Sequence, residues 1–182
     1  MEILTERLLL KRYDNSCITD YFRLKSCAAV WDYSTFVPME SIREAECKLN
    51  KMIVSQDQGE AGFLALYRRD NNQFIGEAGI IARNSHANRC EIGYNLLPEF
   101  WNQGFATEIA VSLVSHGICE LGYERVEALV LSDNKASCRV LEKAGFQCEG
   151  VLRHFNKSGN KYRDVNYYGL ISSDIKFISH SE

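Results

Sequence analysis

Residues 101–107 read Trp-Asn-Gln-Gly-Phe-Ala-Thr and join a strand to a helix, which is a junction that can bind phosphate. The first N–H groups of a helix have no intrahelical acceptor, and the helix dipole favours an anion beside them. Gly104 suits this role because a Cβ at that position would hold a phosphate away from the backbone. The sequence therefore predicts a pyrophosphate cradle made by Asn102, Gln103, Gly104, Phe105, Ala106 and Thr107.

A second strand-to-helix junction lies at Asn134, at the head of a helix that ends at Gly145 and Phe146. Each junction alone is a weak signal, since most glycines before a helix only serve a turn. Asn134 is likewise a common type of helix N-cap. The presence of both junctions in one chain is the more informative feature.

Together the two junctions resemble those of the GCN5-related N-acetyltransferases. Residues 101–108 stand in the place of their acetyl-CoA loop, and residues 134–146 in the place of their fourth helix. The chain is most similar to the RimJ/RimL type, and the resemblance spans nearly its whole length. The other segments that match this type are 5–12, 75–77, 91–94 and 163–170. One departure from the wider superfamily is Trp101, where an Arg or Gln usually opens the loop.

The resemblance implies a fold, a co-substrate and further contacts. The fold would be α/β (α+β), with a mixed, mostly antiparallel central sheet of six to seven strands, a splayed strand pair and about four helices. The co-substrate would be acetyl-CoA, and no metal is expected. Its contacts outside the cradle would be Asn134, Ser137 and the backbone groups that the splayed strand frees at Asn95, Leu96 and Leu97.

Transfer of an acetyl group from a thioester to an amine needs a neutral amine, a stabilised oxyanion and a protonated or solvated leaving thiolate. Glu91 has the spacing of the family's catalytic base, and strand alternation places it on the face opposite Cys90 and Ile92. The alternative is a glutamate that only orders water or supports the strand. Glu77, on the preceding strand, is the second candidate base.

Ser137 lies one turn into the helix after Asn134, where relatives of this type place a serine near the CoA sulfur. A thiol has a pKa near ~8.5 and an alcohol is far less acidic, so a hydrogen bond to the thiolate is expected rather than proton transfer. The alternative is a local helix cap. The expected wall of the acceptor cleft consists of Trp31, Tyr33, Phe36 and Pro38, and the alternative is that these residues belong to the core. Glu77 is also expected to contact the substrate.

Periodicity and turn residues predict the elements that position these side chains. Strands are expected over 8–12, 63–68, 74–82, 90–97, 125–131, 146–153 and 162–171. Helices are expected over about 16–28, from 41 to a stop at 59–62, over 106–121 and over 135–144. One acetyltransferase domain would span 1–182, with a core over about 3–172 and a frayed end over 173–182.

The composition argues against several classes of partner. A net charge of −3 gives no field that would recruit nucleic acid or an anionic membrane. The seven cysteines form no CxxC pair and no Cys/His set spaced for zinc. Their odd number, the acidic start and the absence of a long apolar run predict a cytoplasmic protein. A homo-oligomer is compatible with these features.

The expected function is acetyl-CoA-dependent acetylation of a primary amine by direct attack, on a ribosomal or other protein N-terminus. An α-amino group with a pKa of about 7.7 to 8.0 leaves more neutral amine than a lysine-like group near ~10.4. Two alternatives stay open: a small acceptor such as a polyamine, aminoglycoside or amino acid, and a non-catalytic acyl-CoA-binding protein. The glycine motifs of dinucleotide-binding domains and P-loops are absent from the sequence.

Overall fold

The computed structural model of the chain describes residues 2–158 and 161–175. Within them, one sheet of eight strands has the order β1-β2-β3-β4-β5-β6-β8-β7. The strands are β1 Glu2–Leu4, β2 Leu8–Lys11, β3 Leu64–Arg68, β4 Phe74–Asn84, β5 Arg89–Leu96, β6 Arg125–Leu131, β7 Gln147–Ser158 and β8 Lys161–Ile171. Only β5 and β6 pair in parallel, and the other neighbours are antiparallel.

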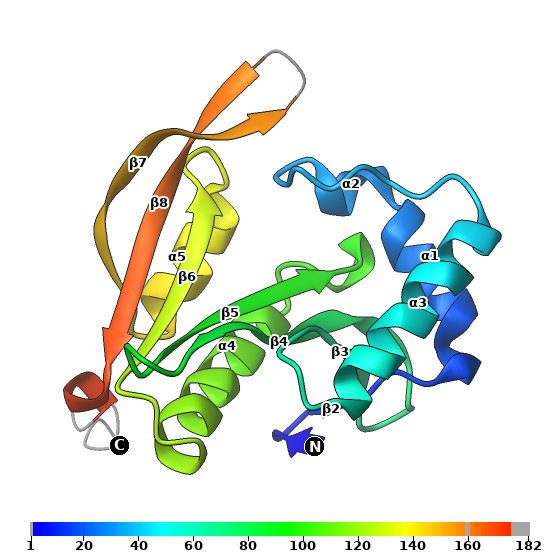
Figure 1. Ribbon diagram of the computed structural model, residues 1–182, viewed down its shortest axis with the longest axis horizontal. Helices are drawn as coiled ribbons and strands as arrows, with labels where there is room; N and C mark the ends of the chain where they lie inside the picture. The colour runs from blue at the N-terminus through cyan, green and yellow to red at the C-terminus, as the bar shows by residue number, and fades with distance from the viewer. Residues whose placement is uncertain (1, 159–160, 176–182) are drawn as a thin grey trace.

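Five α-helices of the described residues pack on this sheet, and they divide between its two halves (Figure 1). They are α1 Ile18–Ser26, α2 Ala28–Trp31, α3 Ile42–Asp57, α4 Phe105–Ser115 and α5 Lys135–Lys143. α1 to α3 lie with the half that contains β2 to β5, and α5 lies beside β6. α4 packs on β5 through the fully buried side chains of Ile109, Ala110 and Leu113. The strands β5 and β6 start together and then diverge, so the sheet opens into a V.

The predicted mixed, mostly antiparallel fold is confirmed, although the strand count was too low. The strand that the sequence did not predict is β1, which contributes three residues and buries Ile3 against the core. So short a strand cannot show an alternating pattern. The hairpin of β7 and β8 is also longer than predicted, and its expected turn at 158–160 lies partly outside the described residues.

The helix expected over 16–28 is divided, which raises the helix count. A 3-10 turn, η1 Asn15–Cys17, precedes α1, and the extended backbone of Cys27 separates α1 from α2. The indole of Trp31 donates to the carbonyl of Leu24 at 3.0 Å, so burial of this ring holds the break in place. Helical periodicity could not predict this tertiary contact.

The predicted helix over 106–121 is also different in its last turns. α4 ends at Ser115 and is followed by a π-helical turn, η3 His116–Glu120. A sequence pattern with a 3.6-residue period does not predict the widened turn.

At the other end of the chain, the 3-10 turn η4 Ser172–Asp174 extends into the segment expected to fray, and residues 176–182 lie outside the described residues. The remaining 3-10 turn, η2 Pro98–Phe100, leads from β5 to the predicted cradle.

Candidate active site

The opening of the sheet begins directly after Glu91. The parallel ladder joins Arg89–Glu91 of β5 to Arg125–Glu127 of β6 and goes no further in the described residues. The rest of β5 keeps its antiparallel ladder with β4. The backbone of residues 92–96 therefore has a paired side and a side that faces the opening.

The hydrogen bond from Leu97 N to Ile75 O, at 2.9 Å, fixes which backbone groups face the opening. In an antiparallel ladder, residues that bond to the neighbouring strand alternate with residues that do not. The backbone N–H and C=O groups of Asn95 therefore also pair with β4, while those of Tyr94 and Leu96 point away from β4. The expectation that the splayed strand frees backbone groups at Asn95, Leu96 and Leu97 therefore fits Leu96, whereas Asn95 and the Leu97 amide pair with β4. The carbonyl of Leu96 accepts from the Trp101 indole at 2.7 Å. This leaves the Leu96 N–H directed into the opening.

The predicted cradle lies at the end of β5 and is a left-handed turn before α4. Asn102 and Gly104 have φ angles of 59° and 82°. The first intrahelical bond joins Glu108 N to Gly104 O at 3.0 Å, so the preceding amides of the helix have no intrahelical acceptor. These are the amides of Phe105, Ala106 and Thr107.

Arg7 lies beside this turn, and no local sequence pattern indicates this position. Its guanidinium donates to Gln103 O at 3.1 Å, pairs with Glu108 at 2.6 Å and lies 4.5 Å from the centroid of the Phe105 ring. A Cβ added to Gly104 would come within 3.3 Å of an Arg7 nitrogen. The turn therefore combines free amides, a bare α-carbon and a cation, which suits a pyrophosphate.

On the other side of the opening, Asn134 caps α5. Its side chain accepts from Ser137 N at 3.1 Å, so the predicted N-cap role is present. The Ser137 hydroxyl lies 2.8 Å from the hydroxyl of Tyr94, which reaches across from β5. Burial raises the pKa of Tyr94 to about 12, so this phenol remains protonated at neutral pH. Tyr94 has no local sequence signal of such a role, because only the tertiary structure brings it to α5.

Glu91 is half-buried at the point where the two strands separate. Burial raises the pKa of its carboxyl group, and the neighbouring charge of Glu127 raises it further. Glu127 itself has a lowered pKa, because hydrogen bonds from Tyr167, Arg125 and Arg89 outweigh the effect of its burial. Two carboxylates in register thus have opposite pKa shifts.

Glu77 is fully buried and its oxygens are already engaged. It accepts hydrogen bonds from Lys25 at 2.6 Å, from Asn95 at 2.9 Å and from Tyr13 at 3.3 Å. Complete burial and three donors keep an incoming amine from reaching this carboxylate. The geometry therefore favours Glu91 over Glu77 as a base.

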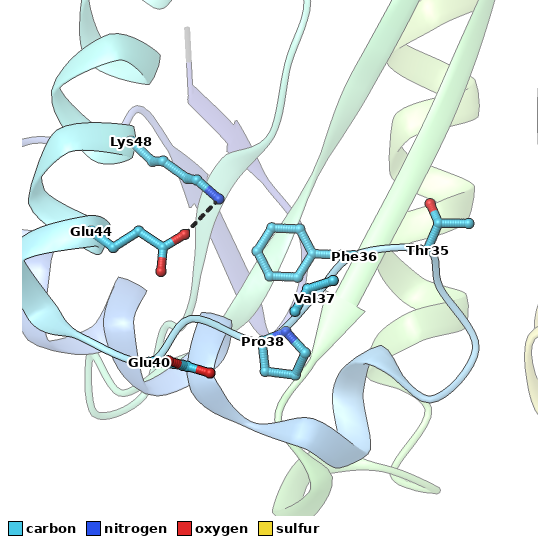
Figure 2. Close-up of a pocket in the computed structure, with 7 residues that line it drawn as sticks. All are labelled: Thr35, Phe36, Val37, Pro38, Glu40, Glu44 and Lys48. Carbon is cyan, nitrogen blue, oxygen red and sulfur yellow. Dashed lines mark ion pairs between the residues drawn. The ribbon is translucent and has the colours of Figure 1, made fainter. Parts of the chain in front are cut away.

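The three aromatic residues of the expected acceptor wall do not form one surface. Trp31 is buried in the core, with its ring 4.3 Å from that of Phe36. Tyr33 is 48% exposed and lies toward β8, where Arg163 is 5.8 Å from its ring. Phe36 lines a pocket of about 420 Å³ together with Thr35, Val37, Pro38, Glu40, Glu44 and Lys48 (Figure 2).

Neither a metal nor a membrane span is indicated in the part of the chain that the structure describes. No group of three or more His, Cys, Asp or Glu side chains is gathered there in a way that could hold a metal ion. In the same residues, every helix is too short or too polar to cross a bilayer.

Comparison with known proteins gives the family of this site. A family model described as an acetyltransferase (GNAT) domain matches residues 7–147. The uncharacterized N-acetyltransferase YoaA of Bacillus subtilis is 35% identical over 167 residues, which cover 92% of this chain and 94% of that protein. The chain belongs to the GCN5-related N-acetyltransferase (GNAT) family, and it is an N-acetyltransferase.

Solved structures with low sequence identity share the fold. RimL, the ribosomal L7/L12 α-N-protein acetyltransferase in complex with CoA, superposes with a TM-score of 0.82 at 23% identity, covering 94% of this chain and 98% of RimL. The spermidine N-acetyltransferase of Vibrio cholerae, in complex with CoA and spermine, has a TM-score of 0.81 at 20% identity, covering 93% and 98%. One of these structural neighbours is thus named for a protein acceptor and the other for a polyamine acceptor.

Proposed function

We propose that the protein transfers the acetyl group of acetyl-CoA to the α-amino group of a protein or peptide N-terminus. The observation that carries this proposal is the opening between β5 and β6. It has the pyrophosphate-compatible turn at one end and the Tyr94–Ser137 pair across it. The CoA present in RimL and in the spermidine enzyme supports the choice of co-substrate.

In this reaction the amine nitrogen bonds to the thioester carbonyl carbon, and the carbon–sulfur bond breaks. The Leu96 N–H is the proposed donor to the carbonyl oxygen, since it faces the opening and negative charge develops there. The nitrogen loses one proton and the sulfur gains one. One residue at the opening is therefore needed to accept the proton from the nitrogen, and another to donate a proton to the sulfur.

Glu91 is the proposed base for the attacking amine. Its raised pKa brings the proton affinity of the carboxylate closer to that of an amine, which favours proton transfer. Ser137 is the proposed donor to the sulfur. If the protonated Tyr94 hydroxyl donates to Ser137, the Ser137 hydrogen is left to point at the leaving group.

The peptide N-terminus is preferred as acceptor because the segments that match the RimJ/RimL type are spread along the whole chain. The second candidate acceptor is a polyamine, which the likeness to the spermidine enzyme favours. We place the reaction in the cytoplasm, where thiols stay reduced, since all seven cysteines are free.

Ligand binding tests the co-substrate. CoA and acetyl-CoA should stabilise the fold by about 2.7 kcal/mol at a hundredfold excess over Kd, and ATP and NAD should have little effect. Equal shifts of Tm with all four ligands would contradict the assignment of acetyl-CoA as co-substrate.

Rates on Ala- and Ser-starting peptides, spermidine and an aminoglycoside then test the acceptor. Faster turnover of spermidine than of any peptide would show that the acceptor is a polyamine and not a peptide.

A further inference from the structure

The ammonium group of Lys25, on α1, lies inside a closed aromatic environment. Its Nζ is 4.6 Å from the ring centroid of Trp31, 5.1 Å from Phe36, 5.4 Å from Tyr21 and 5.5 Å from Phe63. It donates to Glu77 at 2.6 Å, and the side chains of Lys25 and Glu77 are 6% and 0% exposed. The Lys25 cage consists of Tyr21, Trp31, Phe36, Phe63 and Glu77.

Stability alone gives no reason for such a cage. Both charges lose their hydration, and replacing a buried ion pair by apolar residues of similar volume is often neutral or stabilising. Several aromatic rings around one cation are, by contrast, the arrangement by which proteins bind alkylammonium ligands. The cage has the chemistry of an ammonium-binding site, and Lys25 is its occupant.

The cage adjoins the candidate active site on the face of β5 that carries Glu91. Asn95 lies on that face and donates to Glu77. Phe63 covers the same face, because a Cβ added to Gly93 would come within 3.1 Å of its ring. The cage thus contacts β5 between the candidate base and the end of the strand.

On its outer side the cage shares Phe36 with the surface pocket. Lys48 lies 5.2 Å from the centroid of this ring and pairs with Glu44 at 2.9 Å. Figure 2 draws this ion pair beside Phe36. The ring of Phe36 therefore belongs both to the surroundings of the buried Lys25 ammonium and to a pocket that is open to solvent. This position is where a cationic acceptor would meet the cage.

We infer that the Lys25 cage is an alkylammonium subsite of the acceptor cleft and that Lys25 keeps it filled. The inference rests on the proposed function, since it requires the acceptor to enter on this face. With Lys25 in place, Glu77 already has a cationic partner. A second ammonium group on an acceptor therefore cannot form an ion pair with Glu77. Lys25 thereby selects acceptors with a single amine, such as a peptide N-terminus, over polyamines.

Chemical rescue tests the subsite directly. Lys25→Ala removes the side chain beyond Cβ, which has the outline of propylammonium. Propylammonium should therefore bind the variant in calorimetry and raise its Tm, whereas the wild-type protein should gain nothing. The uncharged control is 1-propanol. The matched control variant is Lys48→Ala, because Lys48 also contacts Phe36 and pairs with a glutamate but is exposed. Equal propylammonium binding by the two variants would overturn the subsite.

Acceptor selectivity tests the role of Lys25. The ratio of kcat/KM for spermidine to that for an Ala-starting peptide should rise about tenfold in Lys25→Ala. An unchanged ratio in a variant that binds propylammonium would overturn the selectivity role and leave the peptide assignment intact. Conversely, wild-type protein that acetylates no peptide would contradict the proposed acceptor without affecting the binding result.

A measurement on the wild-type protein keeps the subsite testable if Lys25→Ala does not fold. Reductive methylation with formaldehyde requires an accessible amine, so Lys25 should react at least about tenfold more slowly than Lys48. Mass spectrometry of the digested protein gives both rates. Equal rates would show that the cage does not hold Lys25.

Discussion

The hydroxyl groups of Tyr94 and Ser137 join β5 to α5 across the opening, at the position proposed for the leaving sulfur. If one hydroxyl orients the other, the two residues act as a unit, and removing either should cost nearly as much as removing both. We expect Tyr94→Phe and Ser137→Ala each to lower kcat about tenfold. The double variant should lose only a few-fold more. Losses that multiply in single-turnover kinetics would mean that the residues act separately.

The raised pKa of Glu91 has a consequence for stability. A carboxyl group whose pKa is raised in the folded state favours folding only while it is protonated, and this contribution is lost as pH rises through the folded-state pKa. Glu91→Gln should therefore raise Tm at pH 7 and leave it nearly unchanged at pH 4. Glu127, whose pKa is lowered, is the matched control. Glu127→Gln should lower Tm at pH 7, and that loss should shrink as pH falls through the folded-state pKa.

The same substitution at Glu91 tests the proposed base. Without a carboxylate, the reaction depends on acceptor that has already lost its proton, so the rate of Glu91→Gln should be lower and keep rising toward the pKa of the amine. A pH profile of kcat/KM for a peptide acceptor measures this. A profile with the wild-type shape would assign deprotonation to another group.

The turn from β5 to α4 needs a left-handed backbone at Gly104, and in the proposed function it also needs space there for a phosphate. Gly104 has a left-handed φ of 82°, which asparagine tolerates far better than valine. Gly104→Val should lose about 1 to 3 kcal/mol of folding stability from backbone strain. Gly104→Asn should stay close to wild-type Tm and yet bind CoA more weakly, because it also places a Cβ in the cradle. Wild-type CoA affinity of Gly104→Asn in calorimetry would rule out the cradle.

The elements themselves were predictable to different degrees. The strand over 125–131 and the helix expected from 41 follow from local patterns and are confirmed. Ser41 is the N-cap of this helix and accepts from Glu44 N. The break at Cys27 and the short strand β1 were not predictable, because a distant contact or a neighbouring strand stabilises each of them. Local propensity decides an element only where tertiary packing agrees with it.

At the scale of the whole molecule, Arg163 on β8 ties the two sides of the V together. It donates to the carbonyl of Asp32, just after α2, at 3.0 Å and pairs with Asp133, just before α5, at 2.5 Å. These contacts bridge the expected acceptor wall and the α5 side of the site. They lie far from the β5–β6 ladder that closes the other end.

Loss of this bridge should loosen the acceptor side more than it destabilises the fold. Arg163→Met should cost no more than about 1 kcal/mol, since the pair is partly exposed. It should increase hydrogen exchange over 31–37 and 132–136 and raise KM for the acceptor. Arg153→Met, at an exposed position on β7, is the control. Equal changes in hydrogen exchange in the two variants would show that Arg163 does not bridge the two sides.

The amino-acid sequence alone was enough to predict the family, the turn proposed to bind phosphate, the cap at Asn134 and the candidate base Glu91. Each of these depends on neighbouring residues along the chain, whose geometry a helix start or a strand fixes locally. Three contacts became visible only in the folded structure: Tyr94 meets Ser137, Arg7 lies beside the predicted cradle, and Glu77 pairs with Lys25. The partners in these contacts are 43, 96 and 52 residues apart. Such pairs form when packing of the sheet brings distant segments together, and local sequence patterns contain no information about that distance.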